Sequence, residues 1–286
     1  MRSKLGRWAF LARVFIQHDM TAQASTRTPR AAWQVQRSVW FALFLRELKT
    51  RFGGHWLGVY WALLEPLAHI VILLLIFGFM RHHVLPGVDY AVFLLVGLVP
   101  FFIFKNLTLR GMEAVDANRG LFGYRQVKPI DPLVARALLE VALYSAVYLI
   151  MLGAMAWVGF TVLPARPLEL MGVSAVLLVF GFGLGLVFAV ATDELPNARS
   201  FIRISFMPLY LLSGIMFPVS ALPPQVLPWL LWNPILHAIE LSRGYFFAQY
   251  HVVHGVSLPY VSAWALGTMA LGLSLYRVRR HRLLAS

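Results

Sequence analysis

Two acidic residues inside long apolar segments are the first candidates for chemistry in this sequence. Glu65 lies near the middle of one apolar stretch, directly before Pro66, and Glu140 lies within another, one helical turn after Arg136. Ionisable groups are costly in hydrocarbon, so they usually face a cavity, a partner or another helix. Glu65 is therefore either an ionised carboxylate facing a cavity or partner, or a protonated acid that bonds between helices. We expect Glu140 to pair with Arg136.

Motifs for enzymatic chemistry are missing from the sequence. It contains no GxxxxGKS/T phosphate loop, no HExxH, no GxSxG and no cysteine. It therefore cannot hold ATP by a phosphate loop, and thiol catalysis is excluded. The closest histidine pairs, His82 with His83 and His251 with His254, have no nearby acidic ligands, which argues against a metal site. We expect no catalytic residue, no metal and no cofactor on this chain.

The elements that carry these residues are predicted to be membrane-spanning helices. The stretch 56–80 has only Glu65 and His69 as titratable side chains, and its 25 residues can cross a bilayer. Over the whole chain, 59% of residues are hydrophobic and 13% are charged, against about 25% charged in soluble domains. The composition indicates an all-α integral membrane protein. Six spans are predicted, at 56–80, 90–109, 133–160, 168–192, 204–219 and 258–276.

Three domains are predicted around these spans. Residues 1–32 form an N-terminal cytoplasmic extension, 33–54 an amphipathic interfacial helix, and 55–286 the transmembrane domain. Between the fifth and sixth spans, 220–255 contains four prolines that interrupt any continuous helix, so we expect two short re-entrant or interfacial pieces.

The distribution of basic residues predicts the orientation in the membrane. Of the 25 lysines and arginines, 22 fall before Trp56, between Lys105 and Arg136, at 199–203 or in the tail after the last span. Because short cytoplasmic loops are rich in these residues, both termini are predicted to be cytoplasmic. The net charge of +13 then reflects this bias and contact with anionic lipid. We expect no nucleic-acid partner.

The interfacial helix is predicted from its two faces. Its apolar residues, Val39, Ala42, Leu43, Leu45 and Leu48, can share one face, while Arg46, Glu47, Lys49 and Arg51 crowd the other. Such a helix is either a plain membrane anchor or a gating or docking element.

The connection between the second and third spans, RGMEAVDANRGLFGYRQVKPIDP, is too long and too charged for a simple turn. Glu113 and Asp116 precede Asn118 and Arg119, which predicts a short polar helix that Gly120 ends. It is either a solvated loop or a surface that another protein contacts.

Several segments together resemble the ABC-2 type export permeases, in particular the branch that moves capsular polysaccharide, O-antigen or teichoic acid. These segments are FLRELKTRFGGHWLGVYWALLEPL at 44–67, LSGIMFPVSALP at 212–223 and NPILHAIELSRG at 233–244. Asn118, Arg119 and Gly120 lie where that family has its coupling helix. The similarity covers about 33–279, and the Glu65–Pro66 pair is most like the Gram-negative capsule exporters.

The resemblance implies a six-helix permease subunit in the bacterial inner membrane that works as a homodimer. Two separate ATPase subunits would bind ATP and magnesium. The cargo would be a lipid-linked acidic polysaccharide, with periplasmic and outer-membrane export proteins as further partners. We call the connection at 110–132 the coupling loop, after the place of the family's coupling helix. Residues in this loop and at the end of the interfacial helix would contact the ATPase or transmit its movement: Glu113, Asp116, Asn118, Arg119, Glu47 and Arg51.

Three other groups of residues are assigned roles in this scheme. Basic residues near the inner headgroups would collect the anionic lipid head: Arg46, Arg51 and Arg110. Aromatic and acidic residues on the spans would line a conduit for sugars, although interface belts and helix packing explain most such aromatics: Tyr60, Trp61, Glu65, Phe101, Phe102, Tyr144 and Tyr148. A half-helix on the outer side, capped by Asn233, would have a structural or gate-lining role rather than bind cargo: Asn233, His237, Glu240 and Arg243.

Two other classes of protein could share this composition. An ATP-independent secondary transporter or flippase would also lack a phosphate loop, but would more often show internal repeats, and none is evident. A membrane-embedded glycan or lipid transferase would need clustered acids or a metal, and the twelve acidic residues are dispersed.

Overall fold

The computed structural model describes residues 32–52, 64, 67–76, 83–85 and 88–285. The chain divides into two units, 1–39 and 40–286. The first predicted span, with Tyr60, Trp61 and Glu65, lies mostly outside the described residues, and 67–76 is helical. The N-terminal extension 1–32 also lies almost wholly outside them.

The described part is mostly helical. It contains two short antiparallel strands, β1 (His83–Leu85) and β2 (Val88–Asp89), and two 3-10 helices, η1 (Asp116–Leu121) and η2 (Val219–Ala221). The α-helices are α2 (Ala32–Phe52), α4 (Tyr90–Met112), α5 (Ile130–Val158), α6 (Pro167–Glu194), α7 (Ala198–Leu212), α8 (Leu227–Leu230), α9 (Pro234–Phe246) and α10 (Leu258–Ala285).

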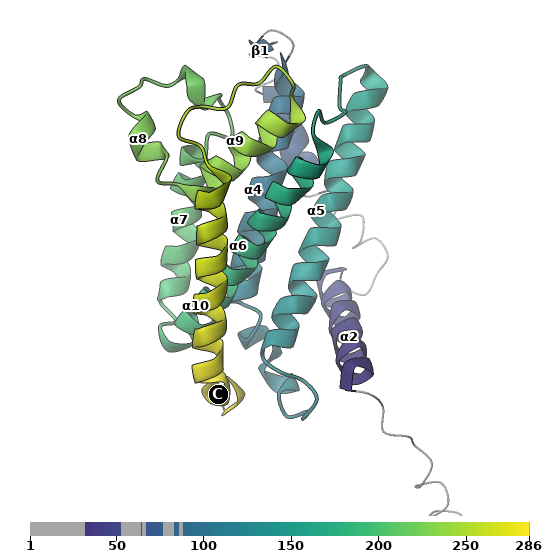
Figure 1. Ribbon diagram of the computed structural model, residues 1–286. Helices are drawn as coiled ribbons and strands as arrows, with labels where there is room; N and C mark the ends of the chain where they lie inside the picture. The colour runs from purple at the N-terminus through teal and green to yellow at the C-terminus, as the bar shows by residue number, and fades with distance from the viewer. Residues whose placement is uncertain (1–31, 53–63, 65–66, 77–82, 86–87, 286) are drawn as a thin grey trace, which may run out of the picture. The chain divides into compact units, whose positions relative to one another are not determined.

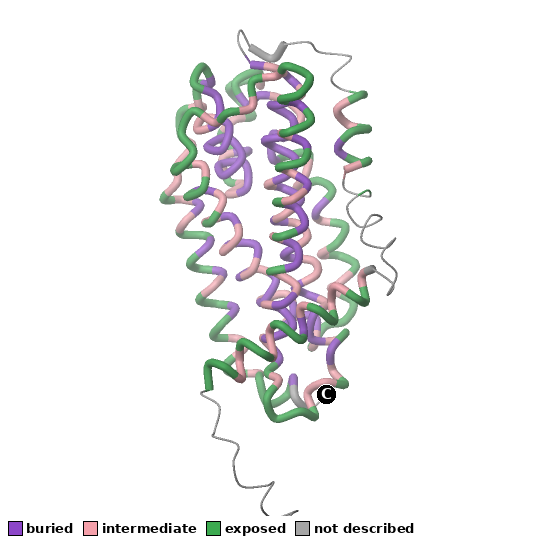
Figure 2. The backbone as a smooth tube through the Cα atoms, turned by 90° about the vertical axis from the view of Figure 1, so that its right-hand side faces the viewer, coloured by how far each residue is buried: buried purple, intermediate pink, exposed green. Residues whose placement is uncertain are grey.

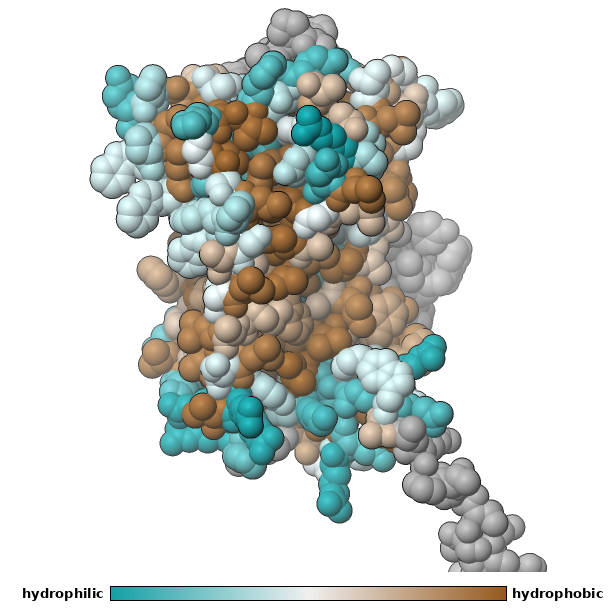
Figure 3. All heavy atoms as spheres, viewed as in Figure 1, coloured by the Kyte–Doolittle hydropathy of each residue, from teal (hydrophilic) through white to brown (hydrophobic). Residues whose placement is uncertain are grey.

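Four of these helices, α4, α5, α6 and α10, are long and apolar enough to cross a membrane. They match the predicted second, third, fourth and sixth spans. On the face shown in Figure 3, hydrophobic residues occupy the middle and hydrophilic residues gather at both ends. Because water is absent from hydrocarbon, each span must satisfy its own backbone groups, which explains why the spans are helices.

The predicted fifth span differs from the structure. The sequence predicts 204–219, whereas α7 begins at Ala198 and ends at Leu212. The helix stops there because Gly214 adopts a positive φ of 66°, which most residues avoid, and the chain then turns. The proline-rich region that follows forms η2, α8 and α9, in agreement with the prediction of short pieces.

Buried residues lie along the inner faces of the helices, with exposed residues outside (Figure 2). The most buried of the four spans is α4, and α6 packs against both α4 and α10 (Figure 1). The main core contains aromatic residues from several elements, including Phe93, Phe101, Phe104 and Phe180.

Glycines in α6 let it approach its neighbours closely. A Cβ at Gly183 would lie 2.7 Å from the backbone nitrogen of Met269, and one at Gly185 would lie 3.0 Å from the carbonyl of Leu107. Small residues drive such packing in membranes, where apolar burial gives helices no advantage over lipid. The two glycines therefore hold α6 against α10 and α4.

We predict that Gly183→Ala destabilises the protein by about 1–3 kcal/mol, because the added methyl group overpacks the contact between α6 and α10. Thermal unfolding in detergent measures this change. Gly172→Ala on the same helix is the control, since a Cβ there has no atom within 4 Å. Equal melting temperatures for the two variants would contradict the packing argument.

Candidate functional site

A carboxylate that forms ion pairs with two guanidinium groups lies in the N-terminal half of α5. Glu140 forms ion pairs with Arg51, from the end of α2, and with Arg110, whose Nε lies 3.0 Å from Glu140 Oε1. The Glu140 side chain is only 1% exposed. A buried charge needs such partners, because desolvation of an ion is costly.

The predicted pairing of Glu140 with Arg136 is wrong. Arg136 instead binds Glu47, with 3.0 Å between Arg136 Nε and Glu47 Oε1, and donates to the carbonyl of Arg110. Glu47 and Arg51 are four residues apart on α2, as Arg136 and Glu140 are on α5. The four charges therefore pair between the helices: Arg51 of α2 with Glu140 of α5, and Glu47 of α2 with Arg136 of α5.

This pairing also changes the predicted polar face of the interfacial helix. Glu47 and Arg51 were expected on an open polar face, but their side chains are only 14% and 13% exposed. On the predicted apolar face, Leu43 is buried, whereas Ala42 and Leu45 are exposed and available for contact with lipid. Interactions with α5 and the coupling loop, rather than periodicity alone, decide which side of α2 is covered.

The coupling loop is joined to α2 through Asn118. This side chain is buried, accepts a hydrogen bond from Arg46 and donates to Glu47 Oε1 at 3.1 Å. Its amide also donates to the carbonyl of Ala114. The loop forms the 3-10 helix η1, which runs to Leu121, so the predicted end at Gly120 is one residue early.

The other side of the coupling loop is joined to α6 and α7. Arg119 binds Asp116 at 2.7 Å and Asp193, at the end of α6, at 2.6 Å. Asp116 also pairs with Arg199, and Glu113 pairs with Arg203, both on α7. The predicted coupling residues thus lie in separate sets of contacts. Asn118 joins η1 to Glu47 of α2, whereas Arg119 and Asp116 join η1 to α6 and α7. Glu113, just after α4, forms its own ion pair with α7.

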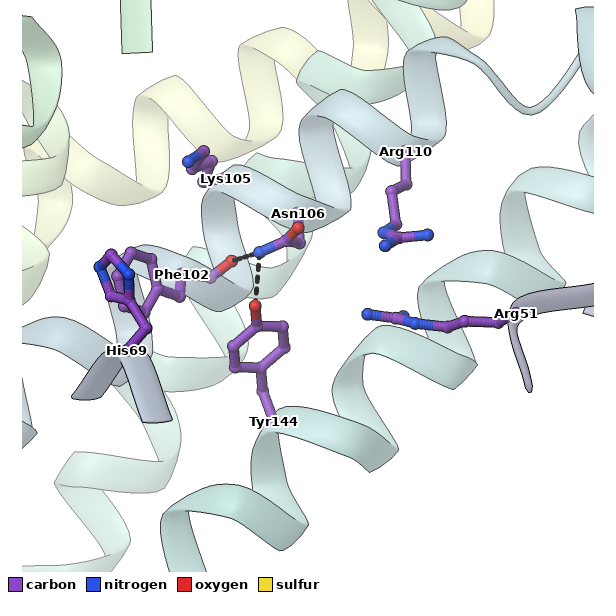
Figure 4. A pocket seen from close by; sticks show the side chains of 7 residues that line it. All are labelled: Arg51, His69, Phe102, Lys105, Asn106, Arg110 and Tyr144. Carbon is purple, nitrogen blue, oxygen red and sulfur yellow. Dashed lines mark hydrogen bonds between the residues drawn. The ribbon is translucent and has the colours of Figure 1, made fainter. Parts of the chain in front are cut away.

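A cationic pocket of about 220 Å³ lies between α4 and α5, beside Arg51 (Figure 4). In it, Asn106 donates 2.8 Å hydrogen bonds to the Tyr144 hydroxyl and to the Phe102 carbonyl. His69 meets the Phe102 ring edge-on, with 5.2 Å between centroids. The lining residues are Arg51, His69, Phe102, Lys105, Asn106, Arg110 and Tyr144.

The charges that line this pocket can attract an anion. Lys105 and two guanidinium groups contribute three positive charges, and the neighbouring Glu140 contributes one negative charge. Guanidinium and ammonium groups bind carboxylates and phosphates. The aromatic rings of Phe102 and Tyr144 add apolar faces beside them. Within the described residues, no three metal-binding side chains come together.

The structure brings together only some of the predicted cargo residues. Phe102 and Tyr144 line the cationic pocket, with Arg51 and Arg110 of the predicted lipid-head group. Arg46 does not line it, Phe101 is buried against Tyr210, and Tyr148 lines a separate groove. Tyr60, Trp61 and Glu65 lie outside the described residues.

Sequence reasoning missed Lys105, Asn106 and His69 as members of this pocket. The signal was present, because Lys105 and Asn106 are polar residues within an apolar helix, like Glu140. Which of these residues share a pocket depends on how α4 packs on α5.

The predicted outer half-helix is α9, and Asn233 caps it as expected. Its side chain accepts a hydrogen bond from the backbone of Ile235 at 3.0 Å, and Pro234 occupies the first helical position. Glu240 and Arg243 are fully buried, with 3.2 Å between Glu240 Oε1 and Arg243 Nη1. Tyr250 donates to the Glu240 carboxylate.

Arg243 joins α9 to the segment after α7 and to α4. Its guanidinium donates to the carbonyls of Gly214 and Ile215, at 2.7 and 2.6 Å, and lies 3.6 Å from the centre of the Phe93 ring. The ring and the carbonyls stabilise the buried cation, and only its Nε lacks a hydrogen-bond partner. Because Glu240 and Arg243 are enclosed, their arrangement favours a structural role over direct cargo binding.

His237 also has a structural arrangement. Its Nε2 lies 2.7 Å from the carbonyl of Leu231, and Nδ1 accepts from the backbone of Ser257 at 3.0 Å. Burial lowers the pKa of His237. These contacts suit a neutral ring with its proton on Nε2, tying α9 to the loops on both sides.

We predict that Glu140→Gln destabilises the protein by about 3–5 kcal/mol, because two guanidinium groups lose their shared counter-charge. Chemical or thermal unfolding of the detergent-purified protein measures the loss. Glu113→Gln is the matched control: its pair with Arg203 is far more exposed, so the expected change is about 0–1 kcal/mol. Similar losses in both variants would show that burial of the Glu140 pair is unimportant.

Comparison with known proteins gives consistent matches. A family model described as ABC-2 type transporter matches residues 38–247. The polysialic acid transport protein KpsM of Escherichia coli is 44% identical over 257 residues, covering 90% of this chain and 99% of the relative. The capsule polysaccharide export inner-membrane protein CtrC of Neisseria meningitidis is 31% identical, covering 74% and 80%. BexB of Haemophilus influenzae, with the same description, is 28% identical, covering 84% and 90%.

Proposed function

The chain belongs to the ABC-2 type transporter family, and on this premise we propose that it is the permease subunit of an ATP-driven exporter of lipid-linked acidic capsular polysaccharide. The named activities of its relatives support the cargo class, since they transport polysialic acid or export capsule polysaccharide. The observation on this chain that carries the proposal is the cationic pocket at membrane depth between α4 and α5.

The pocket suits the charged part of such a cargo. An acidic glycan carries carboxylates, and a lipid anchor can carry phosphate, and both match Lys105, Arg51 and Arg110. The small volume fits one charged group with its neighbouring sugar better than a long segment of polymer. We therefore assign the pocket to the first capture of the anionic head, with Phe102 and Tyr144 as apolar contacts for a sugar ring.

The subunit would have six spans, with α7 and the segment that contains 67–76 added to the four long apolar helices. Both termini would be cytoplasmic, which the distribution of basic residues supports. Exposed apolar residues on α7, including Phe201, Ile204 and Met207, suit contact with a second copy in a homodimer. The inner-membrane descriptions of CtrC and BexB support the location.

ATP and magnesium would bind to two separate ATPase subunits, and this chain would carry no cofactor. Movement of an ATPase against the coupling loop would reach α7 through Glu113 and Asp116, and α2 through Asn118. The exposed tip of the loop at 123–126, which includes Tyr124, is available for contact with the ATPase. Because Arg51 of α2 lines the cationic pocket, movement that reaches α2 would also reach the pocket. Periplasmic and outer-membrane proteins would receive the polymer.

We predict that Arg119→Ala uncouples ATP hydrolysis from export, because it removes the ion pair between η1 and Asp193 of α6. In proteoliposomes with the ATPase partner, export per ATP should fall about tenfold, in the range of typical coupling energies. Phosphate release and glycan export measured together give this ratio.

Lys49→Ala, on the exposed side of α2, is the control and should keep the normal ratio. If Arg119→Ala exports as much glycan per ATP as the unmodified permease, the Arg119 ion pairs have no part in the mechanism. Export by the permease alone, without any ATPase, would instead favour the secondary transporter or flippase.

We predict that Lys105→Glu lowers export of an acidic capsular glycan about tenfold, because the pocket then repels an anion that Lys105 attracts. The size follows from the value of one hydrogen bond to a charged group, about 1.5–3 kcal/mol. Export assays with the reconstituted permease and ATPase measure the effect. Lys105→Arg keeps the charge and should retain most activity. Equal export by the two variants would show that the pocket does not select for negative charge.

A further inference from the structure

A second cavity, separate from the cationic pocket, opens between α5 and α6. It has a volume of about 580 Å³, with α4 residues such as Val99 and Ile103 on its floor. Leu149 of α5 and Leu170 and Ser174 of α6 form part of its walls. Figure 1 shows α5 and α6 as neighbouring helices that carry these residues. We call this cavity the α5–α6 groove.

The groove is apolar and open to its surroundings. Its lining is mostly aliphatic, with Ser145, Tyr148 and Ser174 as its polar residues. The Ser174 hydroxyl donates to the carbonyl of Leu170 within its own helix. At its edges, Leu149 is 68% exposed and Met171 is 69% exposed. All three helices that line it are long, apolar candidate spans, so the groove lies at membrane depth.

We propose that the α5–α6 groove binds one acyl chain of an anionic phospholipid from the outer leaflet, with the lipid phosphate at Arg166. A void in contact with hydrocarbon gains dispersion energy when a chain fills it. The inference that a phospholipid binds does not depend on the proposed cargo. Only the assignment to the outer leaflet depends on the proposed orientation.

The position of Arg166 provides the charge complementarity. It precedes α6 directly, and the backbone of Leu170 donates to its carbonyl, so it lies one helical turn from a wall residue of the groove. Three of the 25 lysines and arginines fall outside the segments predicted to be cytoplasmic, and the proposed orientation places them on the outer side. They are Arg81, which lies outside the described residues, the fully buried Arg243, and the exposed Arg166. Arg166 is thus placed to reach a headgroup above the groove, as long basic side chains do at interfaces.

The shape of the groove favours a lipid chain over a second copy of this protein. A helix is about 10 Å across, so the groove would hold little more than about one turn of it. A hydrocarbon chain is narrower and flexible, and needs no hydrogen-bond partner. The exposed apolar face of α7 suits a second copy, and none of its residues lines the groove.

We test the proposal by native mass spectrometry of the permease–ATPase complex released from nanodiscs of phosphatidylethanolamine and phosphatidylglycerol. The unmodified permease should retain one phosphatidylglycerol per chain. Ser174→Trp, which fills the groove, should lose it. Arg166→Gln should reduce the preference for phosphatidylglycerol about tenfold, and Arg166→Lys should preserve it.

Gly172→Trp is the matched control, because it places the same side chain on α6 at a position with no atom within 4 Å. It should retain the lipid. If Ser174→Trp does not fold, Leu149→Trp fills the groove from the exposed side of α5. Equal retention in the filled variants and in Gly172→Trp would overturn the proposal, as would no retained lipid in the unmodified permease.

The chain contains no cysteine, so Ser174→Cys introduces a single thiol for crosslinking. A disulfide between two copies, or a crosslink to another protein, would show that protein occupies the groove and would overturn the proposal. A retained molecule whose mass includes sugars would also overturn it, because the groove would then belong to the cargo. Absence of crosslinks together with retained phosphatidylglycerol supports it.

Discussion

The need to neutralise Glu140 constrains the end of this protein at which α2, α4, α5 and the coupling loop meet. Its carboxylate lies on a membrane-spanning helix and is almost completely enclosed, so it requires cations. Arg51 and Arg110 meet this need and thereby join α2 to α5 and α4. Glu47 and Arg136 pair in the same way, and Asn118 attaches the coupling loop to Glu47. One electrostatic constraint thus determines where α2 lies relative to the pocket and to the loop.

The cationic pocket is a consequence of the same arrangement. Two arginines that neutralise one carboxylate leave net positive charge, and Lys105 adds to it. The groups that stabilise the structure are therefore also the groups that can attract an anion. Replacing Arg51 or Arg110 would therefore change both the stability of the protein and its attraction for an anion. Lys105 has no ion pair among the described residues, so its replacement would change the attraction alone.

The apolar helices pack tightly in some places and leave open surfaces in others. The glycines of α6 bring its backbone close to the backbones of α4 and α10, so these three helices pack tightly. Between α5 and α6 a groove remains instead, and α7 leaves an apolar face exposed. Helices that pack on lipid or on another subunit need such surfaces, because lipid chains or the partner complete their packing. At the opposite end of the helices, buried Arg243 holds α9 against its neighbours without opening a polar site.

The sequence by itself determined that this is an all-α membrane protein, where four of its spans lie, and that Asn233 begins a helix at Pro234. Hydrophobic length and capping are local properties, so no tertiary information was needed. Only the tertiary structure decided that Glu140 pairs with Arg51 rather than with Arg136, that Tyr148 lines a different cavity from Tyr144, and that Lys105 joins the cationic pocket. These outcomes depend on which helices meet. At membrane depth a charge takes whichever partner packing brings closest, and spacing along one helix cannot specify that choice.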